Sequence, residues 1–339
     1  MIPIFIIGTE RSGTNLLRLM LNMHPNIFVP HPPHIMKFFN PIVHRYGDLK
    51  KDRNFKKLIS DVCRMVELHS YQWEIKPNRE RVFASTRDRN LISIYFEIYN
   101  QYLEFTGKTR WACKSTFMIE HIPEILNYYP DAKFIYMVRD GRDVAVSSKS
   151  SIFNHFNIYY IAKLWKKEQE TGLHLLEKLS SDRIMLLKYE DLITEPASMI
   201  QKVCTFLNET FDEKMLQYHN SSEAVKSGSL SISWKNTSKP VISDNKEKFR
   251  TLLSSQEIKL FEAITCIQMD KLGYQLSYPL EDLMLIHESM MKPKLSYWLS
   301  EKFLYLKAEM KHISSDNNSN MRLKKIWYMR YIRFVRRLS

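Results

Sequence analysis

Several features that decide the class of a protein are scarce in this chain. Only four of its 339 residues are cysteine, and their wide spacing forms no Cys-x-x-Cys pair and no dense disulfide framework. We therefore expect buried thiols in a reducing compartment. No apolar run approaches the roughly 18 to 20 residues that cross a bilayer, and no charged leader precedes a cleavable segment. The sequence predicts a cytoplasmic protein, with peripheral membrane contact left open.

Acidic residues are fewer than basic ones. The chain has 50 Lys and Arg against 37 Asp and Glu, a net charge of +13, while 44% of its residues are hydrophobic. This composition is typical of a globular protein, and its charge favours anionic partners such as nucleotides, acidic glycans or acidic membranes. Seven basic residues and no acidic one follow Asn317. The excess charge is therefore concentrated at the C-terminal end.

Short apolar runs alternate with stretches of helical spacing, which is the pattern of a parallel sheet with crossover helices. A helix over residues 255–272 is predicted from a capping box at Ser254 and Glu257 and from Gly273 at its C-terminal end. Four of the apolar runs are predicted strands: residues 2–7, 111–114, 133–138 and 184–187.

The predicted organisation has three parts. Residues 1–275 form an α/β domain with a parallel sheet flanked by helices, residues 276–316 a helical extension, and residues 317–339 a basic amphipathic tail. The polar stretch 221–248 is predicted to be a long surface loop that covers a site, and residues 316–320 a linker.

The first predicted strand runs into a G-x4-G loop, from Gly8 to Gly13, which is followed by a helix. The backbone N–H groups of such a loop surround a phosphate or sulfate, and the helix N-terminus adds a favourable dipole. A nucleoside triphosphate loop continues with Lys and Ser or Thr, but this chain has Thr14 and Asn15. The loop thus predicts an anion site without the key residue of a kinase, and its cation is Arg11.

A second anion site is predicted at the end of the strand over residues 133–138. Arg139 follows that strand, and Ser147 lies eight positions later on a predicted helix. Ligands bind at the carboxyl ends of the strands in open α/β sheets, and an Arg with a hydroxyl suits a phosphate dianion. An ordinary strand–turn–helix corner with solvated charges is the alternative.

The run from Arg11 to Leu17 resembles the 5′-phosphosulfate loop of the sulfotransferases that use 3′-phosphoadenosine 5′-phosphosulfate (PAPS), with Asn15 in place of the commoner Thr. Arg139 and Ser147 are similar to the 3′-phosphate motif of that family. The resemblance implies a P-loop-type α/β fold, PAPS as cofactor and 3′,5′-ADP as product. It places cofactor contacts at Arg11, Ser12, Gly13, Thr14, Asn15, Arg139 and Ser147.

Shorter matches extend the resemblance. Tyr189 begins a Tyr-Glu-Asp-Leu segment whose Tyr approaches the adenine in the family. Lys114 matches a lysine that stabilises the transferring sulfuryl group in tyrosylprotein and glycan sulfotransferases. Ser233 and Lys248 correspond to cofactor contacts of a closing loop in the tyrosylprotein branch. Each of these residues also has an ordinary structural interpretation, as a strand end or a surface side chain.

Transfer to a hydroxyl needs a base, and His31 is the candidate, with His34 as the fallback. Both lie in a proline-rich stretch where the family places a Glu or His base. The catalytic set is thus Arg11, His31 and Lys114, and no metal is expected because no His or Cys residues have ligand spacing. A carbohydrate hydroxyl on a glycan, glycolipid or polysaccharide precursor is the expected acceptor. Peptide tyrosine, a small alcohol or phenol, a P-loop kinase and a polyanion-binding protein without catalysis are alternatives, and no nucleic-acid partner is expected.

The basic tail mixes aromatic residues with arginine in a possible amphipathic helix. Such a helix lies on anionic lipid, holds an acidic glycan, or packs its apolar side on the protein body. The sequence alone leaves these three interpretations open.

Overall fold

A single parallel sheet lies at the centre of the molecule. The computed structural model describes residues 1–149, 151 and 155–338, and its five strands have the order β2-β3-β1-β4-β5, all parallel. The expected α/β fold is confirmed, with one strand more than predicted. The strands are β1 (Ile4–Ile7), β2 (Ile27–Phe28), β3 (Arg110–Cys113), β4 (Lys133–Val138) and β5 (Ile184–Lys188).

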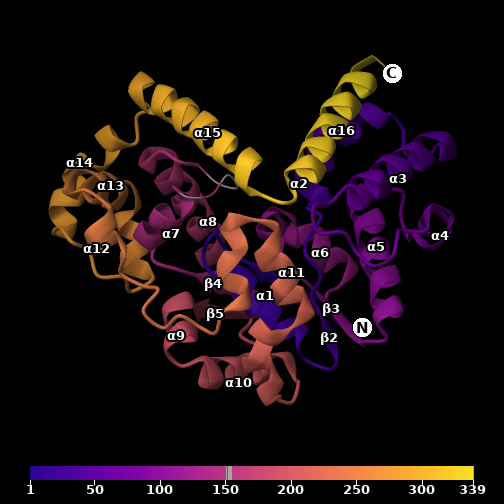
Figure 1. The fold of residues 1–339 in the computed structure, drawn as a ribbon, viewed down its shortest axis with the longest axis horizontal. Coiled ribbons are helices and arrows are strands. Elements are labelled where there is room, and N and C mark those ends of the chain that lie inside the picture. The colour runs from indigo at the N-terminus through magenta and orange to yellow at the C-terminus, as the bar shows by residue number, and fades with distance from the viewer. Residues whose placement is uncertain (150, 152–154, 339) are drawn as a thin grey trace.

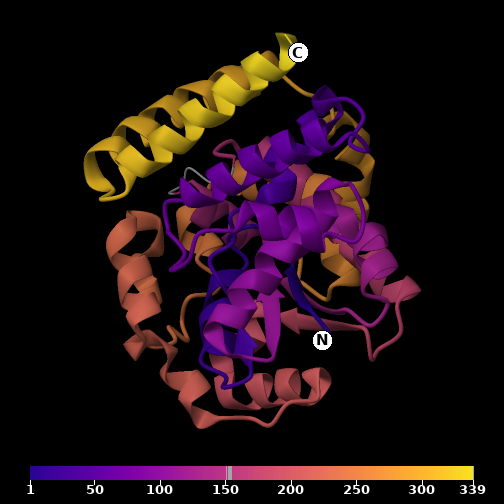
Figure 2. The ribbon, with the colours of Figure 1, turned by 90° about the vertical axis from the view of Figure 1, so that its right-hand side faces the viewer.

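Helices cover both faces of this sheet (Figures 1 and 2). Short 3₁₀ helices are labelled η. The helical elements are α1 (Thr14–Asn22), α2 (Ile35–Phe39), η1 (Asn40–Tyr46), α3 (Asp52–Glu67), α4 (Arg79–Ser85), α5 (Leu91–Thr106), η2 (Thr116–His121), α6 (Ile122–Tyr128), α7 (Gly141–Ser148), α8 (Ile158–Lys178), α9 (Tyr189–Thr194), α10 (Pro196–Leu207), η3 (Glu213–Asn220), α11 (Ser222–Leu230), η4 (Ile232–Ser238), α12 (Phe249–Leu252), α13 (Ser255–Lys271), α14 (Leu280–Met290), α15 (Leu295–Ser315) and α16 (Ser319–Leu338).

The central strand β1 contributes to two hydrophobic cores because successive side chains of a strand point to opposite faces. Phe5 and Ile7 pack in a core that includes residues of α3, α5, α8 and α13. Ile4 and Ile6 pack in a second core with residues of α1, α9 and α10. All four side chains are fully buried. A strand buried on both faces fixes the position of the loop that follows it.

Two predictions of irregular structure are wrong. The stretch 221–248 holds α11 and η4, and only its last part is irregular. Ser221 accepts a hydrogen bond from the backbone N–H of Ala224, so the serines that suggested a loop act partly as helix caps. The predicted linker over residues 316–320 is a tight turn, because α16 begins at Ser319. Asp316 is buried there and accepts hydrogen bonds from Ser231 and His312.

The predicted ends of α13 are confirmed. Ser254 and Glu257 form a complete capping box at the start of this helix. Gly273 follows its end with a φ of 68°, in the left-handed region that favours glycine. Helices α14 to α16 complete the C-terminal extension (Figure 1). Among the described residues, no helix is long and apolar enough to cross a membrane.

Candidate active site at the carboxyl ends of the strands

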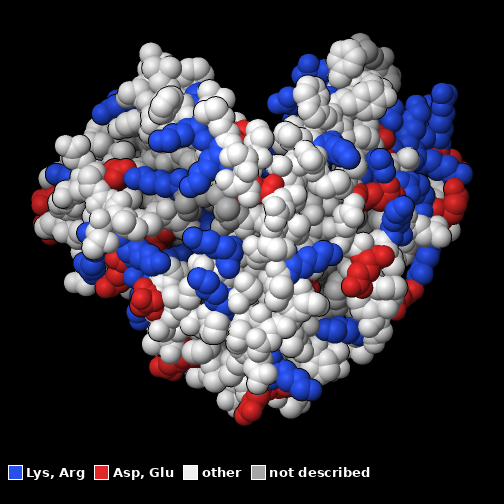
Figure 3. Space-filling view, viewed as in Figure 1, with Lys and Arg blue, Asp and Glu red and all other residues white. Residues whose placement is uncertain are grey.

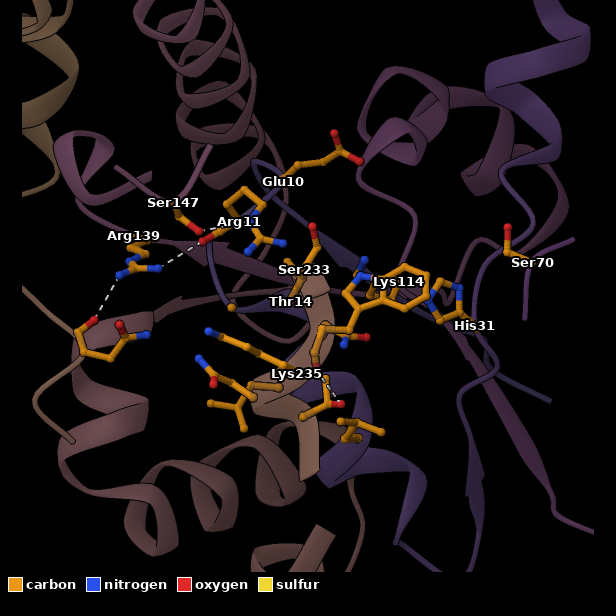
Figure 4. A pocket seen from close by; sticks show the side chains of 18 of the residues that line it. Glu10, Arg11, Thr14, His31, Ser70, Lys114, Arg139, Ser147, Ser233 and Lys235 are labelled. Atoms are coloured by element: carbon orange, nitrogen blue, oxygen red, sulfur yellow. Dashed lines mark hydrogen bonds between the residues drawn. The ribbon is translucent and has the colours of Figure 1, made fainter. Parts of the chain in front are cut away.

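A residue that follows each strand of the sheet lines one cavity of about 890 Å³. The loop with Arg11 follows β1, Lys114 follows β3, and His31 comes after β2. Arg139 follows β4, and Tyr189 follows β5. Because the strands are parallel, the side chains line up in the order of the strands, from His31 at one edge to Tyr189 at the other. Figure 4 shows Arg139 and His31 on opposite sides of Arg11.

The loop between β1 and α1 is built for close approach to a ligand. Gly8 and Gly13 have φ values of 136° and 87°. A Cβ atom on Gly8 would lie 2.1 Å from the carbonyl oxygen of Met137, and one on Gly13 would lie 2.3 Å from the Tyr189 ring. Helix α1 begins at Thr14 without a side-chain cap. Its first N–H groups are therefore available to an anion in the cavity.

Several polar atoms around this loop are buried without a partner in the described part of the chain. They are the Ser12 hydroxyl, Asn15 Nδ2 and Arg139 Nε. Asn15 accepts a hydrogen bond of 2.7 Å from Arg18 Nε through Oδ1, so its amide nitrogen is the group left over. Buried hydrogen-bond donors without a partner are costly, and a bound anion would satisfy them.

The two predicted anion motifs meet in the structure. Arg11 donates from Nε to Ser147 Oγ at 3.0 Å, and Arg139 donates to the Arg11 carbonyl oxygen at 3.2 Å (Figure 4). The Arg139 guanidinium also lies 4.4 Å from the centre of the Tyr189 ring. Burial, together with the charge of Arg139, lowers the pKa of Arg11. Two cations and a hydroxyl from separate segments thus surround one part of the cavity.

The irregular segment after η4 closes over this part of the cavity. Asn245 donates from Nδ2 to the Tyr189 hydroxyl at 2.6 Å, and its carbonyl oxygen accepts from Arg139 at 2.9 Å. The predicted contacts Ser233 and Lys248 both line the cavity, and the Ser233 hydroxyl is buried without a partner among the described residues. All the predicted cofactor residues therefore lie in or beside one site.

Lys114 lies on the other side of Arg11. Burial lowers its pKa to about 8, and the carboxyl of Glu10 opposes that shift. Burial also raises the pKa of Glu10, although Lys37, Lys114 and Arg11 favour its charged form. Glu10 lines the cavity and was not predicted, because a single residue between the two glycines of a loop carries no signal of its own.

His31 is held in an aromatic cluster at the edge of the cavity. Its carbonyl oxygen accepts a hydrogen bond from Trp73 at 2.9 Å, and its ring lies 4.7 Å from Trp234 and 5.5 Å from Tyr71. The side chain is buried, and Nδ1 has no hydrogen-bond partner among the described residues. Burial lowers the pKa of His31 well below its usual value. The ring is therefore neutral at pH 7, as a proton acceptor must be.

The fallback base, His34, has a different environment. Its Nδ1 lies 2.9 Å from the Ser115 hydroxyl, and its pKa is also well below the usual value, mainly because of burial. Ser115 thus engages one ring nitrogen of His34, whereas Nδ1 of His31 has no hydrogen-bond partner among the described residues. No group of three or more His, Cys, Asp or Glu residues with metal-ligand geometry occurs in the part of the chain that the structure describes.

Comparison with known proteins identifies the family of this chain. The model of the Sulfotransferase family matches residues 3–213. The chain belongs to the sulfotransferase family. This finding confirms the resemblance on which the motif assignments depend.

Relatives of this sulfotransferase-family chain include the protein-tyrosine sulfotransferase of Drosophila melanogaster, 24% identical over 220 residues, which are 63% of this chain and 40% of the relative. Protein-tyrosine sulfotransferase 1 of Danio rerio is 25% identical over 237 residues, 68% of this chain and 59% of the relative. The chain thus spans about half the length of these relatives.

Solved structures show the same fold. The sulfotransferase domain from the Synechococcus PCC 7002 olefin synthase matches with a TM-score of 0.54 at 21% identity, over 81% of this chain and 95% of that domain. The sulfotransferase domain from the curacin biosynthetic pathway matches with a TM-score of 0.52 at 19% identity, over 80% of this chain and 98% of that domain.

One important pair in this sulfotransferase-family chain escaped the sequence analysis. Arg18 lies on α1, its side chain is fully buried, and it forms an ion pair with Glu223 of α11. Asn22 donates a second hydrogen bond to Glu223 at 2.8 Å. The pair joins the glycine loop and its helix to the segment that carries Ser233. A single arginine within the apolar run of residues 16–21 was the signal for a buried ion pair.

Proposed function

We propose that this protein transfers the sulfuryl group of PAPS to an acceptor hydroxyl and releases 3′,5′-ADP. The observation that carries the proposal is the network of Arg11, Ser147 and Arg139 beside the glycine loop. Unpartnered buried donors at Ser12 and Asn15 add to it. This donor set fits a ligand with two separate anionic groups, as PAPS has at its 3′ and 5′ positions.

Each residue then has a defined task. The glycine loop, Thr14 and Asn15 hold the 5′ end of the nucleotide, while Arg139 and Ser147 hold the 3′-phosphate. PAPS supplies an activated sulfuryl group on a phosphate leaving group. Arg11 and Lys114 provide fixed positive charge at the point of transfer. Neutral His31 accepts the proton of the acceptor hydroxyl at a ring nitrogen, a contribution of about 10²- to 10⁴-fold in rate.

The proposed acceptor is a carbohydrate hydroxyl. Trp234 lines the cavity beside His31 and offers a flat ring on which the apolar face of a sugar packs. An alkyl hydroxyl also needs a base more than a phenol does, and His31 supplies one. A peptide tyrosine is the second candidate, because the relatives named above are protein-tyrosine sulfotransferases. Sulfation assays with sugar and tyrosine-peptide acceptors distinguish the two.

Calorimetric titration tests the cofactor assignment. We expect 3′,5′-ADP to bind wild type without a metal ion, and Arg139→Ala to lose most of this affinity because the Arg139 guanidinium is assigned to the 3′-phosphate. A P-loop kinase would prefer ATP with Mg²⁺. A polyanion-binding protein without catalysis would bind 3′,5′-ADP weakly and show no turnover. Either result would contradict the proposal.

A further inference from the structure

Helix α15 exposes an apolar stripe along its whole length. Leu295, Leu299, Phe303, Leu306, Met310 and Ile313 recur every three or four residues, and each is between 45% and 73% exposed. This spacing places them on one face of the helix. His312 is the only residue of α15, among those described, that is buried. In Figures 1 and 2 the helix stands off the body at one end of the molecule.

Helix α16 lies at the same end and has a second exposed stripe. Trp327, Tyr331 and Phe334 are 63%, 59% and 63% exposed, while Met329 and Ile332 pack on the body. Packing therefore explains only one side of this helix. Eleven of the twenty exposed large hydrophobic side chains in the described chain belong to α15 and α16. A concentration of this kind is typical of an interaction surface.

The acidic side chains of these two helices are paired or buried, whereas several of the basic ones are exposed and unpaired in the described chain. The two glutamates of α15 are engaged in the structure, Glu301 with His155 and Glu309 with Arg322. Asp316, in the turn between the helices, is buried. The described part of α16 has no acidic residue, and its exposed Lys324, Arg330, Arg333 and Arg337 form no ion pair among the described residues.

Basic side chains also flank the apolar stripes. Lys302 lies 5.8 Å from the Trp298 ring on α15, and Arg330 lies 5.4 Å from the Trp327 ring on α16. Figure 3 shows the two helices as separate upper lobes with uncharged surface and with Lys and Arg beside it. An apolar stripe bordered by cations and aromatic rings fits the interface of an anionic bilayer.

We propose that α15 and α16 together form a docking surface for anionic membranes. A second copy of this chain suits the surface less well, because a symmetric contact would bring the unpaired cations of α16 against one another. A bilayer with acidic headgroups instead neutralises these cations and covers both stripes. The surface is built from two helices, so docking also fixes the orientation of the protein on the membrane.

The same helices form part of the wall of the active-site cavity, through Tyr305 and Lys311 of α15 and Lys325 of α16. Helical spacing places these cavity residues on a different face from the exposed stripes, so docking holds the cavity behind the two helices and close to the membrane. This step rests on the proposed function: it identifies the acceptor as a hydroxyl on the headgroup of a membrane lipid, in agreement with a carbohydrate acceptor.

Co-sedimentation with vesicles tests the docking surface without any activity measurement. The full chain should bind vesicles of phosphatidylcholine with about 30 mol% phosphatidylglycerol far better than phosphatidylcholine alone, and about 0.5 M NaCl should weaken binding. The variant Arg330→Gln/Arg333→Gln/Arg337→Gln should lose about a hundredfold in affinity, since each basic residue near an anionic surface contributes roughly fivefold. Phe303→Asp/Trp327→Asp should lose at least about tenfold.

Matched controls separate the surface from general charge and hydrophobicity. Lys178→Gln/Lys202→Gln/Lys214→Gln removes three exposed lysines outside the two helices, and Phe105→Asp changes a phenylalanine that is 53% exposed on α5. Both controls should bind as wild type does. Circular dichroism and 3′,5′-ADP binding confirm that each variant is folded.

Two results would overturn the proposal. One is that wild type does not bind anionic vesicles, or that neither the arginine variant nor Phe303→Asp/Trp327→Asp weakens this binding. The other is sedimentation of wild type as a dimer that Phe303→Asp/Trp327→Asp dissociates, which would make a second copy the occupant. Failure of sulfuryl transfer with intact vesicle binding would refute the proposed function and leave the docking surface standing.

Discussion

Removal of the Glu223 carboxylate tests the buried ion pair that Arg18 forms beside the glycine loop. Arg18 is fully buried, and the side chain of Glu223 is 16% exposed. In Glu223→Ala the guanidinium keeps hydrogen bonds to Asn15 at 2.7 Å and to the Val29 carbonyl oxygen at 3.2 Å, but it loses its only carboxylate among the described residues. An uncompensated buried charge costs about 3 to 5 kcal/mol. Because these two hydrogen bonds persist, we expect a loss of about 3 kcal/mol in the free energy of unfolding.

Urea unfolding followed by circular dichroism measures this loss. The control is Glu104→Ala, which breaks an ion pair with Arg81 in which the side chains are 57% and 44% exposed. Exposed pairs contribute less than about 1 kcal/mol. Glu223→Gln keeps an acceptor without the charge and should give an intermediate value. If Glu223→Ala destabilised the protein no more than Glu104→Ala does, the ion pair would not have the structural role assigned to it.

Three further predictions concern the cavity. Gly13→Ala places a Cβ atom 2.3 Å from the Tyr189 ring at a φ of 87°, so calorimetry should show an affinity for 3′,5′-ADP at least about tenfold weaker; unchanged affinity would contradict the loop geometry. His31→Gln should lower kcat by about 10²-fold or more at constant PAPS affinity, and normal turnover would exclude His31 as the base. Burial lowers the pKa of His69 to about 3. Only in the unfolded chain does His69 take up a proton as the pH falls from about 7.5 to 5.5. This uptake lowers the free energy of unfolding by about 1.4 kcal/mol. Unfolding measured at both pH values should show that the free energy of unfolding falls less in His69→Gln than in wild type. An equal fall in the two proteins would refute the low pKa of His69.

The sequence predicted those parts of the site that depend on local signals. Gly8, Gly13 and Arg11 lie within six residues of one another, and Ser147 follows Arg139 by eight positions. Each group also follows a strand whose apolar run is visible in the sequence. Since parallel strands end at the same edge, the prediction that these groups meet follows from the fold class alone.

The parts that were missed depend on contacts between distant segments. Glu223 is 205 positions from Arg18, so the sequence around Arg18 indicates a buried cation but does not identify its partner. Strand β2 has two residues, too few to show an alternating pattern, and its pairing with β3 defines it. The polar composition of residues 221–238 hid α11 and η4, because their stability comes from packing against α1 and η3 rather than from helix propensity.

The position of β1 in the middle of the sheet has a consequence for how such proteins diversify. The contacts assigned to the nucleotide come after β1, β4 and β5 and from residues 233–248, whereas His31 and Lys114 come after β2 and β3. Residues 23–90 carry β2, α2, α3 and α4 and supply none of the assigned nucleotide contacts. From the proposed assignments we expect substitutions in this segment to change the choice of acceptor while donor affinity is kept, so that new substrates are acquired without loss of the donor.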